Sequence, residues 1–447
     1  MVKVCKFGGS SAAAKNGYEK IKEIVFTDKN RKYIVVSAPG KRFDGDTKVT
    51  DLLLEAYSKK ETAEEYLPSA KKIINRFAEI SSFVGARAYE IQKEIERFFL
   101  TDYRESDADY FVSRGEYFSA KLVAAYLNCD FVDAKDLLIF DYNGKFNLTD
   151  TKIRCEKLLN GDKTVVIPGF YGGYPNGKVN LLGRGASDYS AACFAAAVHA
   201  GMYENFTDVN GVLSADPKSV QNPATIPFLT FSELQRFSFS GAKVLEERTL
   251  EPLIGLNIPV TVKNTFNPYI GGTIISEERT GFSGKPLGIA GKRGLIAFNI
   301  AVKTCSDQVK TIRGISSFLA EKGEKAETFF YENKLAYFIC EEEKLHSDRQ
   351  TLQNSLSVLY GVEKVNVAEI CKITIIGESG SDKNSPTELK AHGIISFLPA
   401  VTKKLETNGI TVLRSNYLLR ENYAEIYLEG DTCGKAEDLA YGILFGK

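Results

Sequence analysis

Short apolar segments alternate with helical ones along the first part of the chain, and this alternation constrains the fold more than any other feature. The predicted strands cover residues 2–7 (VKVCKF), 33–38 (YIVVSA), 164–170 (TVVIPGF) and 204–209 (ENFTDV), with helical spacing of apolar residues between them. Apolar strands separated by helices are typical of a buried, mainly parallel sheet that is covered on both faces. We therefore predict a three-layer α/β sandwich with a mainly parallel central sheet over residues 1–290.

The chain after this region repeats one order of elements twice. The segment GISSFL at 314–319 matches GIISFL at 393–398 at five of six positions, at the same place in each repeat. We therefore predict two ferredoxin-like βαββαβ units, at 294–368 and 369–447. Their predicted elements are a strand at 294–303, a helix at 308–323 and strands at 325–332 and 334–341, then a strand at 369–377, a helix at 389–408, strands at 410–414 and 423–429 and a helix at 435–444.

The composition argues against several classes of protein. The chain has 57 Lys and Arg against 57 Asp and Glu, so it has no net positive field to hold nucleic acid or an anionic membrane. No segment reaches the roughly 18 uninterrupted apolar residues of a membrane span, and the N-terminus lacks a signal peptide. The eight cysteines form no C-x-x-C pair, and the three histidines have no partner that would make a metal-binding face. We expect a cytoplasmic protein with reduced cysteines, no nucleic-acid partner and no membrane partner.

The first polar motif, KFGGSS at residues 6–11, directly follows the first predicted strand. Its glycine pair lets the backbone approach a bulky anion, and exposed N–H groups at such a turn can bind phosphate. Lys6 stands where its amine can reach a transferred phosphoryl group. Taken alone, the motif is also compatible with a plain turn. The chain contains neither a P-loop nor the HRD and DFG motifs of protein kinases.

A second motif, GRGASD at residues 183–188, opens an alanine-rich helix. The unpaired N–H groups at a helix N-terminus favour an anion. Helix capping alone would explain Ser187 and Asp188, but it does not explain Arg184 between two glycines.

Two further motifs follow in the same half of the chain. TDVNGV at 207–212, continued by SADPK at 214–218, comes after a predicted strand and is also compatible with a plain hairpin. GAKVL at 241–245 places a second lysine among small neighbours.

Together and in this order, the motifs resemble the aspartate kinase branch of the amino acid kinase family. The likeness extends along the chain, because VVSA at 35–38, SRGE at 113–116 and NTFNP at 264–268 also match the branch. The duplicated C-terminal part resembles the paired ACT domains of the same enzymes. The resemblance implies a catalytic domain at 1–290, followed by ACT-like regulatory units at 294–368 and 369–447.

The resemblance also implies the reaction and its residues. The γ-phosphoryl group of ATP would pass to the β-carboxylate of L-aspartate, giving 4-phospho-L-aspartate and ADP, with Mg²⁺ carried by the ATP phosphates and not ligated directly by the protein. This is the first step of lysine, threonine and methionine biosynthesis. The implied catalytic residues are Lys6, Asp188 and Lys243. The implied aspartate-binding residues are Thr50, Glu116, Arg184 and Ser187. The implied ATP-binding residues are Lys6, Gly8, Gly9, Ser10, Ser37, Thr207, Asp208, Asp216, Lys218 and Lys243.

The chemistry of these residues suits that reaction. Arg184 can bind a carboxylate with two parallel hydrogen bonds, and Glu116 can pair with an α-ammonium group. A carboxylate acceptor is already ionised at neutral pH, so catalysis needs positioning and charge neutralisation more than a general base. The chain departs from the family pattern at several positions. Ser10 replaces the commoner threonine, Ala186 a frequent glycine and Phe206 a common tryptophan, and Glu246 and Glu247 follow GAKVL where many members have His-Pro.

Regulation and assembly are likewise implied by the resemblance. The turn at 304–308 is the expected contact for an effector amino acid, through Ser306, Asp307 and Gln308, although the same turn could simply cap the following helix. Lysine is the expected inhibitor, because the short chain resembles lysine-sensitive members. ACT units commonly pair across subunits, so we expect a homodimer or homotetramer.

Two alternatives stay open at this stage. One is a kinase for glutamate or N-acetylglutamate, which the SRGE segment and the duplicated tail disfavour. The other is a catalytically inactive amino-acid sensor, which the intact lysines and Arg184 disfavour. A fusion to homoserine dehydrogenase is not expected, because the chain ends at Lys447.

Overall fold

The computed structural model describes residues 1–159, 163–183, 185–242, 245, 247–279, 281, 284–303, 308–379, 393–418 and 421–446. Its contacts divide the chain into two compact units, which are described separately below. The N-terminal unit comprises Met1–Val212, Thr225–Leu234 and Val244–Glu278. The C-terminal unit comprises Leu213–Ala224, Gln235–Lys243 and Arg279–Lys447.

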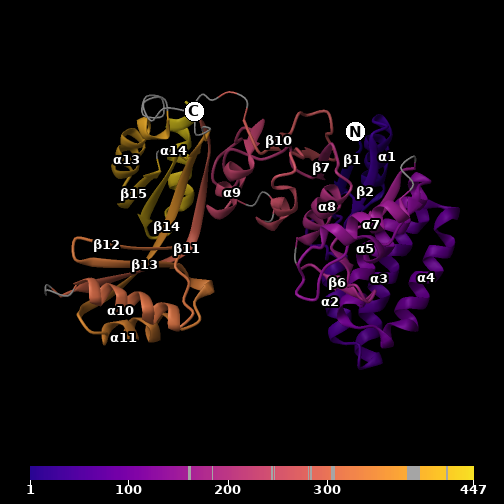
Figure 1. Cartoon of the computed structure of the whole chain (residues 1–447), viewed down its shortest axis with the longest axis horizontal. Coiled ribbons are helices and arrows are strands. Elements are labelled where there is room, and N and C mark those ends of the chain that lie inside the picture. The colour runs from indigo at the N-terminus through magenta and orange to yellow at the C-terminus, as the bar shows by residue number, and fades with distance from the viewer. Residues whose placement is uncertain are drawn as a thin grey trace. The chain divides into compact units, whose positions relative to one another are not determined.

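The N-terminal unit is built on an eight-stranded sheet with the strand order β3-β4-β2-β1-β7-β9-β10-β8 (Figure 1). Neighbouring strands are parallel except β9 and β10, which are antiparallel. This confirms the predicted mainly parallel sheet. The strands are β1 (Lys3–Phe7), β2 (Arg31–Val36), β3 (Asp130–Phe131), β4 (Val165–Pro168), β7 (Met202–Thr207), β8 (Phe228–Thr230), β9 (Val260–Asn264) and β10 (Thr273–Ser276), with a separate hairpin of β5 (Tyr171–Gly173) and β6 (Val179–Leu181).

Alternate residues of one strand face two different helical layers. Cys5 and Phe7 of β1 pack into the core beneath α1 to α5, whereas Lys6 between them reaches α8. Tyr33 of β2 likewise makes an edge contact with Phe194 of α8. Helices therefore cover both faces, as the apolar strands predict. The helices are α1 (Lys15–Thr27), α2 (Val49–Ser58), α3 (Ala63–Val84), α4 (Tyr89–Leu100), α5 (Ala108–Leu127), α6 (Ala134–Leu137), α7 (Leu148–Leu158) and α8 (Ala186–Ala197).

Local sequence explains where the two helices of the candidate site begin. Asp107 caps α5, because its side chain accepts a hydrogen bond from the backbone N–H of Tyr110. Helix α8 follows Gly185, whose φ of 74° lies in the left-handed region that glycine adopts without strain. Small alanines then let α8 lie close to the sheet, and nearly all of its residues are buried.

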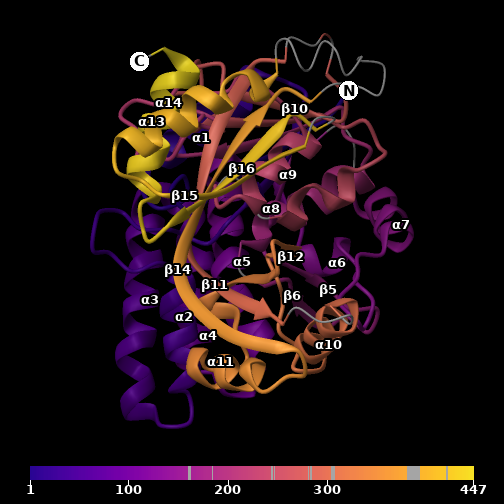
Figure 2. The same cartoon turned by 90° about the vertical axis from the view of Figure 1, so that its left-hand side faces the viewer.

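The C-terminal unit contains a six-stranded antiparallel sheet with the order β12-β13-β11-β14-β16-β15. The two central strands, β11 and β14, are long and pair with each other along nearly their whole length. Figure 2 shows the long, curved course of β14. The strands are β11 (Pro286–Val302), β12 (Thr328–Glu332), β13 (Leu335–Glu341), β14 (Val362–Gly377), β15 (Val412–Leu418) and β16 (Tyr423–Glu429).

Two pairs of helices cover the two halves of this sheet. Helices α10 and α11 pack on the half formed with β12 and β13, and α13 and α14 pack on the half formed with β15 and β16. This arrangement confirms the prediction of two ferredoxin-like halves. Helix α11 was not among the predicted elements, and it supplies the second helix of the first half. The helices are α10 (Gln308–Glu321), α11 (Arg349–Ser357), α13 (Leu398–Thr407) and α14 (Cys433–Phe445).

The central strand β11 begins earlier than the sequence suggests. The sequence predicts a strand at 294–303, whereas β11 covers Pro286–Val302. In the structure a register shift lies between Lys292 and Leu295, and the strand continues on both sides. Residues 286–292 thereby pair with the part of β14 that belongs to the second half.

Two shorter predictions concern the same unit. The turn expected at Asn333 is present, with Asn333 and Lys334 both at positive φ, and it joins β12 to β13. Part of the helix expected at 389–408 lies outside the described residues, and α13 covers Leu398–Thr407. Among the described residues, no helix has the length and apolar content needed to cross a bilayer.

Candidate active site

Lys6 and Asp188 form an ion pair near the carboxyl end of the central strand β1 in the N-terminal sheet. Lys6 Nζ lies 2.6 Å from Asp188 Oδ1, and Lys6 is only 7 % exposed. Lys6 comes from β1 and Asp188 from the first turn of α8, so the pair links the sheet to the helix that covers it. A buried ammonium at this point can neutralise charge on an anionic ligand while the carboxylate fixes its direction.

The glycines beside Lys6 make a narrow contact between two loops. Gly40 N donates to Gly9 O at 2.8 Å, and Gly8 N donates to Phe206 O at 3.1 Å. A Cβ added to Gly9 would lie 2.9 Å from Ala38 O, and one added to Gly40 would lie 2.7 Å from the carbonyl carbon of Gly9. Neither position tolerates a side chain without a backbone shift. Packing therefore requires glycine at positions 9 and 40, whereas a Cβ at Gly8 would lie 3.6 Å from Lys6 Nζ, an ordinary contact distance.

A buried arginine that the sequence analysis did not single out holds the second of these loops. Arg76 of α3 donates from Nη2 to Gly40 O at 2.6 Å and from Nη1 to Asp46 Oδ2 at 2.9 Å. Arg42 pairs with the same carboxylate at 2.8 Å. An arginine in the middle of an amphipathic helix gives no sequence signal that distinguishes it from a solvent-facing residue.

Glu116 is a buried carboxyl group inside the same region. It is 3 % exposed, and its Oε2 has no hydrogen-bond partner in the structure. Burial raises the pKa of Glu116 to about 8, against a smaller opposite effect of the backbone N–H of Ala38. Because Ala38 also lies against Gly9, the carboxyl group and the glycine contact belong to one site.

The two hydroxyl-bearing residues predicted for the acceptor each lie in the first turn of a helix, Ser187 in α8 and Thr50 in α2. Ser187 is in the first turn of α8 and is 9 % exposed, and a Cβ at Gly169 would lie 3.2 Å from its Oγ. Thr50 is half-buried in the first turn of α2, the helix that packs on α5. Gly115 of α5 lies against Leu53 of α2, where a Cβ would approach to 2.8 Å. This close packing brings α2 next to Glu116.

The predicted ATP-binding residues of the N-terminal unit follow the ends of adjacent strands. Ser10 lies in the loop after β1, and Ser37 follows β2, where its N–H donates to Phe7 O at 3.1 Å. Thr207 ends β7, and its hydroxyl lies 3.1 Å from the carboxylate of Asp208. Because β1, β2 and β7 are parallel neighbours, their carboxyl ends share one edge of the sheet, which is where open α/β sheets bind ligands.

Asp216 and Lys218 belong to the C-terminal unit. Lys218 N donates to Asp216 Oδ1 at 2.9 Å, so the two residues form one compact turn, and Lys218 is exposed. Four other predicted residues, Arg184, Lys243, Ser306 and Asp307, lie outside the described residues. Gln308 is the first residue of α10.

The described residues contain no group of three or more His, Cys, Asp or Glu side chains that could hold a metal ion. The donor set near Lys6 consists of one carboxylate already paired with an ammonium group. These residues suit a metal that arrives bound to phosphate oxygens better than one held by the protein itself.

A buried ion-pair network supports the opposite ends of the same strands. Glu204 of β7 is fully buried and accepts from Arg31 Nε at 2.7 Å and Lys263 Nζ at 2.9 Å. Burial would raise the pKa of Glu204, but the hydrogen bonds and charges of Arg31 and Lys263 dominate and hold it at about 2. The network ties β2, β7 and β9 together, and the sequence analysis missed it because its members are far apart in the chain.

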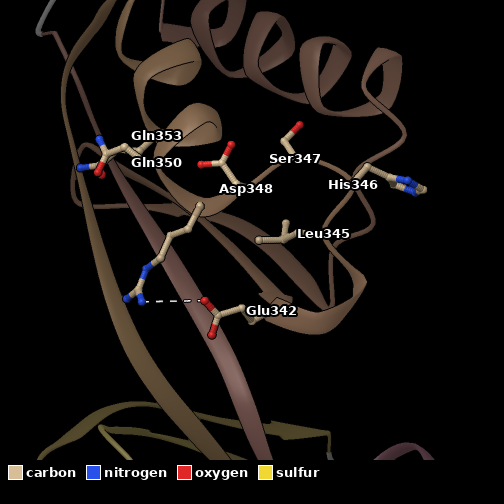
Figure 3. A pocket seen from close by; sticks show the side chains of 8 residues that line it. Glu342, Leu345, His346, Ser347, Asp348, Gln350 and Gln353 are labelled. Atoms are coloured by element: carbon tan, nitrogen blue, oxygen red, sulfur yellow. Dashed lines mark ion pairs between the residues drawn. The ribbon is translucent and has the colours of Figure 1, made fainter.

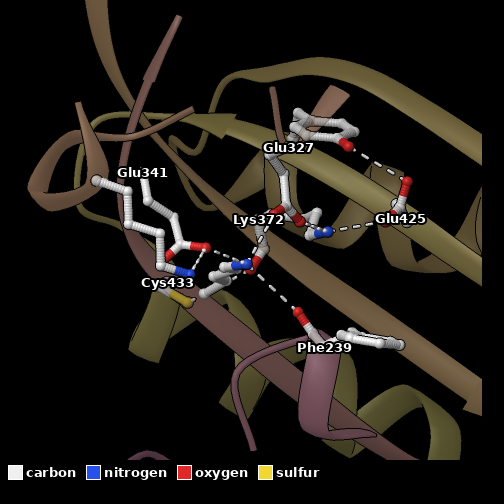
Figure 4. Close-up of polar contacts among 9 residues, drawn as sticks. Phe239, Glu327, Glu341, Lys372, Glu425 and Cys433 are labelled. Atoms are coloured by element: carbon white, nitrogen blue, oxygen red, sulfur yellow. Dashed lines mark hydrogen bonds and ion pairs between the residues drawn. The ribbon is translucent and has the colours of Figure 1, made fainter. Parts of the chain in front are cut away.

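A second charge network lies on the C-terminal sheet (Figure 4). Lys372 of β14 is nearly buried and pairs with Glu327 at 2.6 Å and Glu425 at 2.8 Å. Lys292 of β11 pairs with Glu327 at 2.7 Å and with Glu341 at 2.9 Å. Because β11 and β14 run through both halves of the sheet, this network couples the two halves electrostatically.

A polar hollow of about 580 Å³ lies where α11 begins (Figure 3). Asp348 uses its carboxylate to cap α11 by accepting from Thr351 N at 3.0 Å, and Arg349 pairs with Glu342 at 3.9 Å. Its charged groups thus already serve the local structure, and the hollow does not define a ligand site.

Comparison with known proteins begins with the N-terminal part of the chain. The profile of the Amino acid kinase family matches residues 1–264, which end with β9. The match therefore includes Lys6, the glycine contact, Glu116 and Asp188. The first unit therefore has the fold of an amino acid kinase.

Three relatives extend the comparison along the chain. Aspartokinase 3 of Bacillus subtilis is 33% identical over 341 residues, covering 72% of this chain and 74% of the relative. The crystal structure of Clostridium acetobutylicum aspartate kinase matches with a TM-score of 0.83 and 29% identity, over 100% of both chains. Escherichia coli aspartokinase III, crystallised with aspartate and ADP, shares the fold with a TM-score of 0.75 and 22% identity, over 100% of both chains. The chain belongs to the amino acid kinase family, in its aspartokinase branch.

Proposed function

We propose that the chain is a feedback-regulated aspartate kinase, which transfers the γ-phosphoryl group of ATP to the β-carboxylate of L-aspartate and yields 4-phospho-L-aspartate and ADP. One observation carries this proposal. The Lys6–Asp188 ion pair lies beside the contact between Gly9 and Gly40, where neither glycine could carry a side chain without a backbone shift. The buried Glu116 carboxyl group, whose Oε2 has no hydrogen-bond partner, lies in the same site. The product enters lysine, threonine and methionine biosynthesis.

The acceptor side of the reaction is assigned to four residues. Glu116 binds the α-ammonium group of aspartate, since its buried Oε2 has no hydrogen-bond partner and a cation would stabilise the carboxylate there. Arg184 binds a carboxylate, and Ser187 and Thr50 complete the acceptor site from the first turns of α8 and α2.

The ATP side is assigned to the loops that follow β1, β2 and β7. Lys6 neutralises charge on the transferring phosphoryl group, and Asp188 holds the Lys6 ammonium in place. Gly8, Gly9, Ser10 and Ser37 approach the phosphates. The remaining nucleotide contacts come from Thr207, Asp208, Asp216, Lys218 and Lys243. Bound to the ATP phosphates, Mg²⁺ would supply charge neutralisation beside the phosphate groups that Lys6 contacts.

No general base is required for this chemistry. The acceptor carboxylate carries its own negative charge at neutral pH, so its oxygen attacks the γ-phosphorus directly while the bond to the β,γ-bridging oxygen breaks. The protein contributes position and charge, for which the buried residues Lys6, Asp188 and Glu116 are suited.

Regulation and assembly complete the proposal. Residues 1–290 form the catalytic domain, and 294–368 and 369–447 form ACT-like regulatory units. An end-product amino acid, lysine in the first instance, binds at the turn of Ser306, Asp307 and Gln308. The subunits pair through their ACT-like units into a homodimer or homotetramer in the cytoplasm. The description of the Clostridium acetobutylicum relative as an allosteric enzyme supports the regulatory part.

The test is coupled ADP release with Mg-ATP and an acceptor, repeated with lysine, threonine or both. ADP formation that depends on L-aspartate and is suppressed by lysine is the expected result. Turnover with glutamate or N-acetylglutamate, and none with aspartate, would show that the acceptor substrate is one of those compounds instead. Absence of turnover with every acceptor, from protein that still binds an amino acid, would replace the enzyme by a sensor.

A further inference from the structure

The loop at residues 213–224 is part of the core of the C-terminal unit. Ala215 and Val220 are buried with apolar side chains of β11, β14 and α14. Between these two anchors, Asp216 is half-buried and Lys218 is exposed. The polar residues in the middle of the loop therefore face outward. The residues on either side of them pack against the C-terminal sheet and α14.

Tyr441 of α14 joins the two ends of this loop. The Tyr441 hydroxyl lies 3.0 Å from Ser214 Oγ and accepts from Ala224 N at 3.1 Å. Ser214 O in turn accepts from Ile289 N of β11 at 2.8 Å. Tyr441 is 2 % exposed, so these bonds form in a dry environment where an unmade hydrogen bond is costly.

Glu437, one helical turn before Tyr441, faces the middle of the loop. Arg293 Nη2 donates to Ser219 Oγ at 3.3 Å and lies 3.7 Å from Glu437 Oε2. Burial raises the pKa of Glu437, while a hydrogen bond with Ser219 and the charge of Arg293 lower it. Positions 437 and 441 share one face of a helix. This face of α14 therefore lies against both the ends and the middle of the loop.

The segment that leads to the GAKVL motif rests on the same strand. Lys292 Nζ of β11 donates to Phe239 O at 3.4 Å, at the end of α9 (Phe231–Phe239). A Cβ added to Gly241 would lie 2.4 Å from Gly291 O, so the two backbones touch. The loop at 213–224 and the segment that leads to Gly241 thus both pack against the sheet of the C-terminal unit.

We propose that Tyr441 is a positioning residue for nucleotide binding, which fixes the loop carrying Asp216 and Lys218 and thereby sets the affinity for Mg-ATP. The inference rests on the proposed function, in which Asp216 and Lys218 contact ATP. It adds a residue of the last helix, far from every kinase motif in sequence, to those that determine how tightly the nucleotide is held.

The experiment compares Tyr441→Phe with wild type. The change deletes one hydroxyl and keeps the ring, which stacks on Phe445 at 4.4 Å. We expect the KM for ATP and the Kd of Mg-ATP, measured by calorimetry without acceptor, to rise about threefold to tenfold. The KM for aspartate stays within twofold of wild type, because the acceptor residues belong to the N-terminal unit.

Matched variants separate positioning from loss of stability. Tyr417→Phe removes another hydroxyl of the same unit, bonded to Asn422 Oδ1 at 3.3 Å, and should leave the KM for ATP unchanged. Ser214→Ala removes the partner of Tyr441 and should raise the KM for ATP. Combined with Tyr441→Phe, it should add less than its own single effect.

Three results would overturn the inference. One is an unchanged Kd of Mg-ATP in both Tyr441→Phe and Ser214→Ala, the second is an equal rise in both KM values, and the third is an equal effect of Tyr417→Phe. Failure of the proposed function is distinguishable, because it would appear as wild-type protein that binds Mg-ATP but releases no ADP with aspartate.

Discussion

Two segments assigned to the nucleotide are held by different parts of the molecule. Gly8 and Gly9 are fixed by main-chain contacts with Phe206 and Gly40, all within the parallel sheet of the N-terminal unit. The loop carrying Asp216 and Lys218 is instead packed into the antiparallel sheet and α14 of the C-terminal unit. The acceptor residues that the structure describes, Thr50, Glu116 and Ser187, all belong to the N-terminal unit.

This difference indicates how regulation can act selectively. In the proposed function, a change in the C-terminal sheet would reach the loop assigned to ATP through the core that both share, because Ala215 and Val220 pack with β11, β14 and α14. The described acceptor residues belong to the N-terminal unit instead. The account therefore predicts that changes in the C-terminal unit alter ATP kinetics, and that changes in the N-terminal unit can alter either substrate.

The largest expected effect comes from Lys6→Ala. We expect kcat to fall about 100-fold or more, because the charge that stabilises the transferring phosphoryl group is lost. Lys3→Ala is the matched control on the same strand, since Lys3 pairs with Asp28 at 2.9 Å at the other end of β1. Circular dichroism checks that both variants fold. Near-normal turnover of Lys6→Ala would remove Lys6 from the mechanism.

Next in size is Glu116→Gln, which tests the acceptor side of the comparison. The KM for aspartate should rise about tenfold to a hundredfold, because a charged hydrogen bond to the α-ammonium group is lost. The KM for ATP should change little. Glu94→Gln is the control, because Glu94 lies in the same unit and pairs with Lys121. A change in the KM for ATP alone would contradict the assignment of Glu116.

A smaller effect is expected from Gly40→Ala, which tests the glycine contact. The added Cβ meets the backbone of Gly9 at 2.7 Å, so the phosphate-facing loop must shift. We expect kcat/KM for ATP to fall about tenfold, since small misplacements of reacting groups are costly. Gly271→Ala adds the same atom to open space and should be neutral. An active, unaltered Gly40→Ala enzyme would show that the contact does not position the nucleotide.

The smallest of these effects is a pH dependence of aspartate binding. With a pKa of about 8, Glu116 is largely protonated at pH 7 in the absence of substrate, and binding an ammonium group requires the carboxylate. The KM for aspartate should therefore fall severalfold as the pH rises from about 7 to about 8.5, with a proton released on binding. Initial rates across this range, with Glu116→Gln as the pH-independent control, check the prediction. A KM that rises with pH would have the wrong sign.

The sequence was sufficient for the class of fold, and most residues of the candidate site in the N-terminal unit stand in motifs at strand ends and helix starts. Buried strands such as 33–38 are readable because they are apolar on both faces, and the motifs that end them fall at one edge of the sheet. Lys6 and Asp188 were expected to cooperate, and the structure brings them to 2.6 Å.

What sequence reasoning missed depends on contacts between distant segments. Arg76, Glu204 and Tyr441 have ordinary neighbours in the chain, and their roles arise only when the fold brings Gly40, Arg31 or Ser214 against them. The membership of residues 213–224 in the regulatory core was missed for the same reason, because the motif reads as a continuation of the kinase sheet.

The most direct test of the central claim is to trap the product. An acyl phosphate reacts with hydroxylamine to give a hydroxamate and inorganic phosphate, so a reaction with Mg-ATP, L-aspartate and hydroxylamine reports the acceptor atom itself. The account predicts the β-hydroxamate of aspartate, formed in proportion to ADP and abolished in Lys6→Ala. ADP release without any hydroxamate, or a hydroxamate formed with glutamate and not with aspartate, would contradict it.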